Sequence, residues 1–405
     1  MSAASTDDPS VARGSAGEVF RAFLALGLTS FGGPVAHLGY FREAFVRRRG
    51  WLDEARFAQL LALCQFLPGP ASSQLGFAIG LLRGGWRGAL AAFIGFTLPS
   101  ALLMFGFAAL APQLAQGWGA AALHGLKLVA VVVVAHSLVG MARQLTPDAP
   151  RMLIAAGTVA LLLSAPNPWM QLVAIALGGT LGLLLRNVTT PSMSVIPLRH
   201  GNRIGVLAMG AFAVGLGAAV LLSWSGTPTL ASLGGAFYRA GALVFGGGHV
   251  VLPLLEQGMV ATGWMGADTF LAGYGAAQAL PGPMFSLAAF LGAEVPTGLP
   301  AAVGASVALL AIFLPGFLLL IAVLPVWARM ARHRLAAGAM AGTNAAVVGL
   351  LAVALYDPVW TDGIRGLADV VVVAIGFALI AFARRSALWV VLWCVGASVA
   401  LHAIR

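Results

Sequence analysis

Two Pro-Gly-Pro motifs interrupt apolar stretches of the sequence, at residues 68–70 and 281–283. Proline removes a backbone donor and glycine permits conformations closed to other residues, so each motif is expected to end a helix. The helix that begins after each motif has unpaired amides in its first turn, which carry partial positive charge and bind anions. Two such N-termini brought together would suit a tetrahedral oxyanion. The alternative is that the prolines only kink helices for packing.

Polar side chains beside these motifs would add hydrogen-bond donors, which an oxyanion needs because it offers only acceptors. Two glycine-rich breaks, at residues 31–33 and 245–248, interrupt apolar stretches in the same way. Around the Pro-Gly-Pro motifs, the candidate binding residues are Gln65, Pro68, Gly69, Pro70, Ser72, Ser73, Gln278, Pro281, Gly282, Pro283 and Ser286. Around the glycine breaks, they are Ser30, Gly32, Gly33, Gly246, Gly247 and His249.

Lys127 is the only lysine of the chain and lies within the apolar stretch 123–135. A lysine without a partner at the bilayer centre costs about 2.5 to 3.5 kcal/mol, so ionisable residues in such places are candidates for function. We expect Lys127 either to face the path of a solute or to extend its ammonium to the membrane interface. Asn344 occupies the equivalent position in the second half and is expected to be a neutral partner.

The composition is that of an integral membrane protein. Of the 405 residues, 60% are hydrophobic and 9% are charged, and the mean hydropathy is +0.93. Soluble domains carry charge on roughly a quarter of their residues, so this chain requires a lipid bilayer around it. The net charge of +10 comes from arginines grouped between apolar stretches. That grouping is typical of cytoplasmic loops, and a nucleic-acid partner is not expected.

Enzyme chemistry has no support in the sequence. Cys64 and Cys394 both lie in apolar surroundings, so we expect core residues and neither a disulfide framework nor a metal site. No P-loop, dinucleotide, metalloprotease or nucleophilic-serine motif occurs in a suitable context, so no cofactor and no ATP-driven step are predicted. Residues 1–17 are polar and are expected to form a disordered cytoplasmic tail without a cleavable signal peptide.

The sequence also contains an internal repeat, which is how many secondary transporters are built. The matching pairs are FGG at 31–33 and 245–247, GW at 50–51 and 263–264, QFLPGP at 65–70 with QALPGP at 278–283, and LP at 98–99 and 314–315. Their order and spacing predict an N-terminal transporter repeat over 18–186 and a C-terminal repeat over 233–405. The linker 187–232 contains an extra transmembrane helix, 204–224, and one extra crossing is what inversion of the halves requires.

These observations predict an all-α polytopic membrane protein with two inverted homologous halves. It would have broken or re-entrant helices, with about nine full crossings plus four hairpins, or about thirteen crossings if the broken segments span. The continuous crossings are expected at 88–110, 121–142, 152–164, 169–185, 204–224, 303–327, 336–356, 367–382 and 388–402. A single crossing through 20–40 would place the arginines at 42–49 outside the cell, against the positive-inside rule, whereas a hairpin returns them to the cytoplasm. The N-terminus is then cytoplasmic and the C-terminus periplasmic.

In these motifs the chain resembles the chromate ion transporter family in its long, two-domain form. The residues that carry the resemblance are FGGP at 31–34, GWL at 50–52, QFLPGP at 65–70, FGGG at 245–248, GW at 263–264 and QALPGP at 278–283. It covers nearly the whole chain, from about residue 20 to 401. Gly248 stands where the first half has Pro34, so the two halves need not contribute equally to the solute site.

The resemblance implies a transporter that exports chromate from the cytoplasm across a bacterial inner (plasma) membrane and confers chromate resistance. Sulfate or another oxyanion is the alternative substrate. A homodimer is a further interpretation, from the abundance of small residues on helix faces. Neither the coupling ion nor the preference between chromate and sulfate follows from the sequence.

Overall fold

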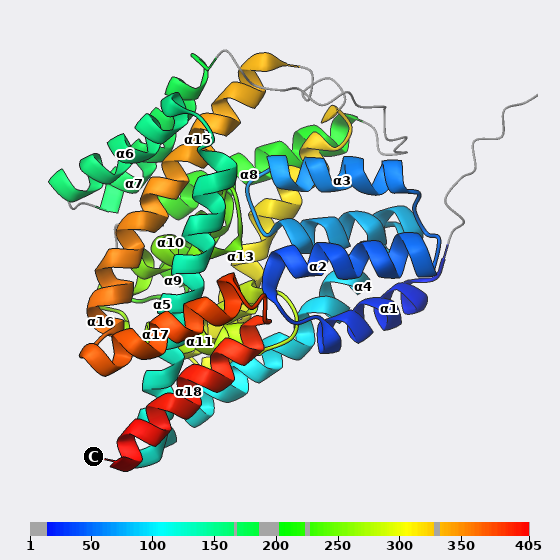
Figure 1. Cartoon of the computed structure of the whole chain (residues 1–405). Helices are drawn as coiled ribbons and strands as arrows, with labels where there is room; N and C mark the ends of the chain where they lie inside the picture. Colours follow the sequence, from blue (N-terminus) through cyan, green and yellow to red (C-terminus); the bar gives the residue numbers. More distant parts are fainter. Residues whose placement is uncertain (1–13, 166–167, 186–201, 223–226, 328–332, 405) are drawn as a thin grey trace, which may run out of the picture.

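The computed structural model describes residues 14–165, 168–185, 202–222, 227–327 and 333–404, and within these ranges the chain is helical with no strand (Figure 1). Most of the predicted tail, part of the predicted linker and the arginines at 186, 199, 329 and 332 lie outside these ranges. The prediction of an all-α polytopic protein is confirmed.

The elements occur in the same order in the two halves. The first half contains α1 (Ala16–Thr29), α2 (Gly33–Phe41), the π-helix η1 (Arg42–Arg48), α3 (Glu54–Phe66), α4 (Ala71–Leu110), η2 (Ala111–Leu114), α5 (Gly117–Leu145), α6 (Ala149–Ser164) and α7 (Pro168–Gly182). After α8 (Asn202–Leu222), the second half contains α9 (Leu230–Leu243), η3 (Gly248–Val250), α10 (Val251–Met259), α11 (Ala267–Ala279), η4 (Met284–Ser286), α12 (Leu287–Glu294), α13 (Ala301–Val323), α15 (Arg334–Ala354), η5 (Leu355–Trp360), α16 (Thr361–Gly363), α17 (Leu367–Ala381) and α18 (Ala387–Ile404).

The long apolar helices coincide with the crossings expected from the sequence. Within the described residues, the segments long and apolar enough to span a membrane are Ala71–Leu114, Gly117–Leu145, Arg203–Leu222, Ala301–Val323, Arg334–Gly363 and Ala387–Ile404. The remaining expected crossings are the shorter apolar helices Ala149–Ser164, Trp169–Gly182 and Leu367–Ala381. At about 1.5 Å per residue these three are roughly 21 to 24 Å long, less than the bilayer core of about 30 Å.

The first broken segment is a re-entrant hairpin. The Phe23 ring of α1 lies 5.5 Å from that of Phe41 and 4.7 Å from that of Phe45, so the chain after the break returns along α1. The arginines of η1 therefore come back to the level at which α1 begins. There Arg83 donates to Glu18 at 3.0 Å and lies 5.1 Å from the ring of Trp51. A kinked crossing would place these arginines at the opposite end of α1.

The second broken segment also returns to the level at which it starts. Glu54, at the start of α3, pairs with Arg42 of η1 at 2.9 Å, and Arg83, in the first part of α4, pairs with Glu18 of α1 at 3.0 Å.

The helix α4 is continuous by its hydrogen bonds but turns sharply after this point. Gly84 and Gly85 have non-helical dihedrals, with φ of −130° and 63°. Beyond them the chain folds back, since a Cβ on Gly80 would lie 2.5 Å from the carbonyl oxygen of Gly88. In the second half α12 and α13 make the same turn, and a Cβ on Gly292 would lie 2.5 Å from the carbonyl oxygen of Gly304.

The two halves are inverted relative to each other. The sequence repeat pairs α5 with α15, and contacts made by two glycines show that these helices run in opposite directions. A Cβ on Gly246 would lie 2.9 Å from Leu145 of α5 and 3.4 Å from Asn344 of α15. Beyond the C-terminal end of α15, a Cβ on Gly363 would lie 2.8 Å from Val131, in the middle of α5, and 3.9 Å from the carbonyl oxygen of Lys127, which is nearer the N-terminal end of α5. The C-terminal end of α5 thus meets the N-terminal half of α15, as inversion requires.

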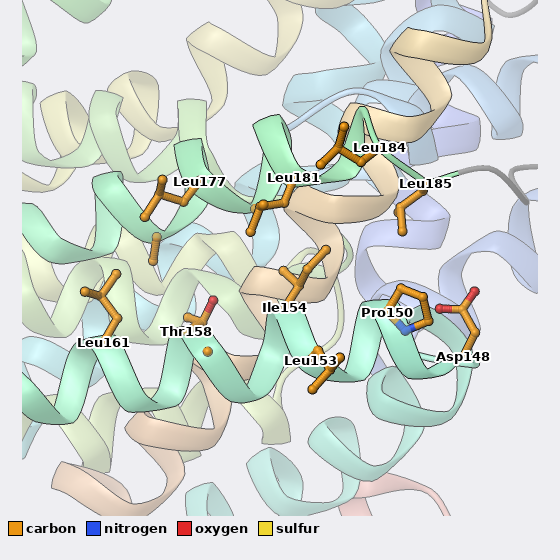
Figure 2. A pocket seen from close by; sticks show the side chains of 13 residues that line it. Asp148, Pro150, Leu153, Ile154, Thr158, Leu161, Leu177, Leu181, Leu184 and Leu185 are labelled. Atoms are coloured by element: carbon orange, nitrogen blue, oxygen red, sulfur yellow. The ribbon is translucent and has the colours of Figure 1, made fainter.

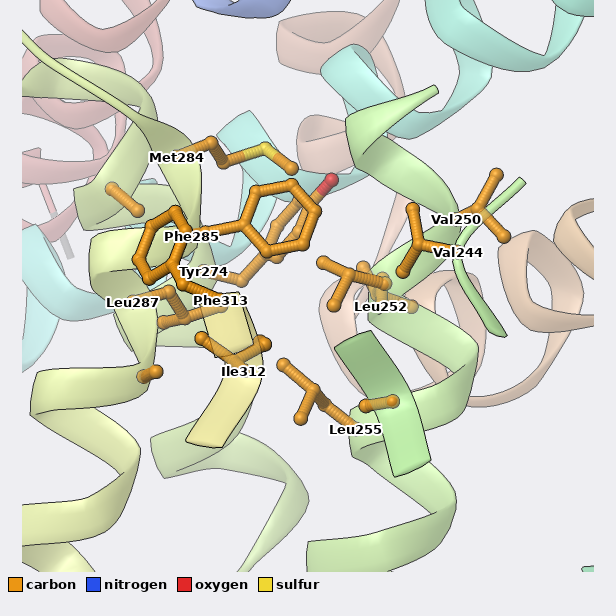
Figure 3. Packing of buried hydrophobic residues seen from close by; sticks show 14 of the residues in the cluster. Val244, Val250, Leu252, Leu255, Tyr274, Met284, Phe285, Leu287, Ile312 and Phe313 are labelled. Carbon is orange, nitrogen blue, oxygen red and sulfur yellow. The ribbon is translucent and has the colours of Figure 1, made fainter. Parts of the chain in front are cut away.

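Buried aromatic and aliphatic side chains hold the second half together around its broken helices. Figure 3 shows Val244 and Leu252 facing Tyr274, Phe285 and Phe313 from neighbouring helices. The Phe285 and Phe313 rings lie 5.9 Å apart. Both cysteines are buried and free, as expected of core residues.

Candidate functional site

The four helix breaks lie in two pairs, and a hydrogen bond joins each pair across the two halves. We call the segments 30–32, 67–70, 244–247 and 280–283 together the four-break junction. The amide of Gly69 donates to the carbonyl oxygen of Val244 at 2.7 Å, and the amide of Gly282 donates to that of Ser30 at 3.0 Å. These two bonds are equivalent under the sequence repeat, so each Pro-Gly-Pro motif is tied to the glycine break of the other half.

Only glycine fits the central position of each Pro-Gly-Pro motif. Gly69 has φ of 121° and Gly282 has φ of 94°, which L side chains rarely adopt. A Cβ on Gly69 would lie 3.0 Å from Cα of Gly316 in α13. On Gly282 it would lie 2.8 Å from Oγ of Ser100 in α4. Gly316 and Ser100 are themselves equivalent in the repeat, because each follows the Leu-Pro pair inside its helix.

Gln74 ties the first Pro-Gly-Pro motif to the second half. Its side chain is fully buried. Its Nε2 donates to the carbonyl oxygen of Pro68 at 3.0 Å and to that of Gly316 at 2.9 Å. The equivalent residue in the second half is Leu287, which cannot make these bonds, so the junction is chemically asymmetric. Sequence reasoning missed Gln74 because it lies one residue beyond the matched serines.

Replacing Gln74 by leucine is expected to weaken the contact between the halves. The change keeps a side chain of similar length but removes two hydrogen bonds, at a cost of about 1 to 2 kcal/mol. The melting temperature of the detergent-solubilised protein should fall. Gln144→Leu, at an exposed site near the end of α5, should leave it unchanged. Equal melting temperatures for all three proteins would show that the Gln74 bonds contribute nothing.

Several buried polar atoms around the first-half breaks have no hydrogen-bond partner within the described residues. They are Ser30 Oγ, His37 Nδ1, Ser73 Oγ, Gln74 Oε1 and Thr97 Oγ1. His37 Nε2 lies 3.3 Å from the Ser30 carbonyl oxygen, and its ring contacts that of Phe96 at 5.2 Å. Gly80 packs on Gly88 and Ala92 in antiparallel register, which brings Ser73 level with Thr97. Buried polar groups left unpaired cost about 1 to 3 kcal/mol each, so this region favours a polar ligand or water.

Other sequence-predicted residues lie at or near the junction but are already engaged or exposed. Gln278 Nε2 contacts Met284 Sδ at 3.2 Å, and His249 Nδ1 lies 2.7 Å from the hydroxyl of Tyr274. The amide of Ser286 donates to the Pro283 carbonyl oxygen at 3.0 Å, so it is not one of the free amides expected there. Both Ser72 and Ser286 are buried, whereas Gln65, Gly32, Gly246 and Gly247 are exposed and Gly33 is half-buried.

Lys127 and Asn344 are not neighbours. Lys127 lies beside Gly363, whereas Asn344 lies beside Gly246 together with Met141 of α5. The 14 residues from Lys127 to Met141 correspond to about 21 Å along α5. The partner of Lys127 is Asp268, in the first turn of α11. A buried lysine implies an acidic partner, but nothing in the sequence spacing indicates which carboxylate it is.

A large groove lies elsewhere, between α6 and α7 (Figure 2). Its volume is about 790 Å³ and its walls are mostly apolar, with leucines that include Leu153, Leu177 and Leu181. Asp148, at one end of the groove, caps the first turn of α6 by accepting from the Arg151 amide at 3.1 Å. An apolar groove of this kind suits an acyl chain and offers few donors to an oxyanion.

Comparison with known proteins agrees with the two-half architecture. The chromate transporter family matches residues 17–183 and again residues 231–399. A probable chromate transport protein of Synechococcus elongatus is 29% identical over 354 residues, which is 82% of this chain and 81% of that protein. Chromate transport proteins of Pseudomonas aeruginosa and Cupriavidus metallidurans are 28% and 29% identical, covering 84% and 81% of this chain and 80% and 79% of their own lengths. No solved structure matches. Since the family matches both halves of the chain, this protein is a member of the chromate transporter family.

Proposed function

We propose that this protein exports chromate from the cytoplasm across the inner membrane and thereby confers chromate resistance. The observation that carries the proposal is the family match over both halves, together with relatives named as chromate transport proteins over four fifths of the chain. The buried polar atoms at the four-break junction support it. Sulfate, which has the same tetrahedral shape and charge, is the alternative substrate.

The proposed binding site lies on the first-half side of the junction. The hydroxyls of Ser30, Ser73 and Thr97 can each donate to an oxyanion, and their oxygens have no other partner among the described residues. The first turn of α4, directly after Pro70, adds backbone amides and the positive end of the helix dipole. His37 can donate from Nδ1 only when it carries a second proton, because its Nε2 faces the Ser30 carbonyl.

The membrane potential favours export of a dianion. In a cell whose interior is negative by 100 mV, each charge that leaves gains about 2.3 kcal/mol. A dianion therefore gains roughly 4.6 kcal/mol, or about three orders of magnitude in concentration. In this proposal the arginine-rich ends of the helices and the N-terminus face the cytoplasm, and the C-terminus faces the periplasm.

Removing two of the junction hydroxyls should reduce transport. We expect Ser73→Ala combined with Thr97→Val to lower the rate of chromate movement at subsaturating concentration by about tenfold or more, since each lost donor to a charged ligand is worth about 1.5 to 3 kcal/mol. The measurement is chromate flux into proteoliposomes under an imposed potassium diffusion potential. Ser306→Ala is the matched control, because Ser306 is exposed on α13 and bonds only within its own helix, to Ala302.

The same assay tests the proposed function itself. Wild-type protein that moves neither chromate nor sulfate under the imposed potential would contradict oxyanion transport. Sulfate flux without chromate flux would show that sulfate is the substrate and would leave the proposed architecture unchanged. Cells expressing the wild type should accumulate less chromate than cells expressing the double variant at equal membrane levels, and the opposite result would contradict export.

A further inference from the structure

Lys127 and Asp268 form an ion pair that joins the two halves of the protein. The ammonium of Lys127 donates to Oδ1 of Asp268, which is its one hydrogen-bond partner among the residues that the structure describes. The two side chains differ sharply in burial, since 4% of the lysine side chain is exposed and 72% of the aspartate side chain. A buried ammonium without a counter-ion is strongly unfavourable, whereas a free carboxylate at an exposed site is not. Asp268 is therefore the member of the pair that can leave.

The surroundings of Lys127 are rich in carboxylates. On α5 itself, Nε2 of His124 lies 3.0 Å from Oδ2 of Asp369 in α17, which also accepts the amide of Arg365 at 2.8 Å. Asp362 of α16 is close enough to interact electrostatically with Lys127 and Asp268. The carboxylates grouped in this region are Glu256, Asp268, Asp357, Asp362 and Asp369, and the cations are Lys127 and Arg365. An anion is attracted here by Lys127 and Arg365 and is repelled by the surrounding carboxylates.

The pair is mechanically connected to the four-break junction. Asp268 lies in the first turn of α11, and the other end of this helix leads directly into the break at 280–283. Between these ends α11 packs against the backbone of α5, since a Cβ on Gly275 would overlap the carbonyl of Leu126. If Asp268 moves away from Lys127, the first turn of α11 moves with it, and α11 connects that turn to the second Pro-Gly-Pro motif.

We propose that Asp268 is the exchangeable counter-ion of Lys127, and that the transported oxyanion displaces it. In the empty protein the carboxylate occupies the place beside the ammonium. An arriving oxyanion accepts the hydrogen bond from Lys127 in its place, and Asp268 moves into solvent among the neighbouring carboxylates. Because the buried ammonium always needs an anionic partner, this gate opens only when an oxyanion is present. The proposal rests on the proposed transport function.

Transport kinetics in proteoliposomes test the exchange. A carboxylate tethered beside the ammonium competes at an effective concentration in the millimolar range, so Asp268→Asn should lower the half-saturating chromate concentration by about three- to tenfold. Lys127→Met should raise it by about tenfold or abolish transport. Asp357→Asn is the control. It removes one negative charge from the same group of carboxylates, but Asp357 accepts a hydrogen bond from Thr361 and makes none with Lys127.

A chemical readout separates this inference from the proposed function. Lys127 is the only lysine, so the mass of its peptide reports its reaction with an amine-reactive reagent without interference from other side chains. Asp268→Asn should increase labelling of Lys127 in the absence of oxyanion, and added chromate should protect the lysine where equal chloride does not. If wild type transports chromate but neither labelling nor half-saturation responds to Asp268→Asn, the exchange is wrong and the function stands. If wild type transports no oxyanion, the proposed function fails.

A structural role for the pair predicts a different pattern. In that case Asp268→Asn would lower the maximal rate and the melting temperature together and leave the half-saturating concentration unchanged, which would overturn the exchange. The double variant Lys127→Met/Asp268→Asn removes both charges and should restore the melting temperature lost in Asp268→Asn, because no buried ammonium is left without a partner. It should still fail to transport, because the ammonium that receives the oxyanion is missing.

Discussion

Gly282→Ala is expected to reduce oxyanion transport by about 100-fold at equal membrane expression. The substitution places an alanine at φ of 94°, in the region that favours glycine, and directs its Cβ to within 2.8 Å of Ser100 Oγ and 3.2 Å of the Phe96 carbonyl oxygen. Backbone strain and overpacking together cost on the order of 2 to 4 kcal/mol. Relief of that strain requires the amide of residue 282 to move away from the Ser30 carbonyl, which opens the four-break junction.

Two glycines separate the contributions to this effect. Gly298 also has positive φ, of 75°, but a Cβ there meets nothing within 4 Å, so Gly298→Ala tests strain alone. Gly106 lies inside α4 with open space beside it, so Gly106→Ala tests neither strain nor clash. The oxyanion flux of Gly282→Ala should be far below that of Gly298→Ala. The flux of Gly106→Ala should equal that of the wild type. Normal flux through Gly282→Ala would show that the junction is not on the transport path.

Gly275→Val is expected to lower the stability of the folded protein more than any other substitution considered above. Gly275 lies within α11 at a point where a Cβ would overlap the carbonyl oxygen of Leu126 and would lie 2.6 Å from its carbon. Both of these are backbone atoms, so no side chain can rotate away. Valine would force α11 off α5 and break the ion pair of Lys127 with Asp268, at a cost of about 3 kcal/mol or more.

The measurement is the melting temperature of the purified protein together with the yield of monodisperse protein in detergent. A glycine inside a helix is less favourable than alanine by about 1 kcal/mol, so propensity alone predicts a gain when a side chain is added. Gly106→Ala, in open space, should show that gain or no change. A Gly275 variant that melts at or above the wild-type temperature would show that α11 does not pack on α5 at this point.

The positions of the helix breaks were predictable from the sequence. Pro-Gly-Pro and the glycine clusters cannot continue a helix, and this is a local property of the backbone that does not depend on the rest of the fold. The arginines at 42–49 were sufficient to favour a hairpin over a crossing, because their location relative to the membrane is also a local constraint. The structure confirms the two helical halves, and it shows their inversion and the return of the chain along α1 after the first break.

The contacts between the breaks were not predictable in this way. The bond from Gly69 to Val244 joins residues far apart in the sequence, and no spacing rule selects one carbonyl over another at that separation. Gln65 and Gln278 occupy equivalent positions in the repeat, yet one is exposed and the other is buried. Whether a side chain at the end of a broken helix reaches the interior depends on which helix packs against it.

The amino-acid sequence by itself determined the membrane class, the repeat, the broken helices and the presence of a single lysine within an apolar stretch, because each follows from composition or from short-range backbone chemistry. Only the tertiary structure decided that Lys127 pairs with Asp268 and not with Asn344. Equivalent helices of inverted halves run in opposite directions, so residues at equivalent positions are carried to different depths. A buried charge is then neutralised by whichever opposite charge the packing brings within reach.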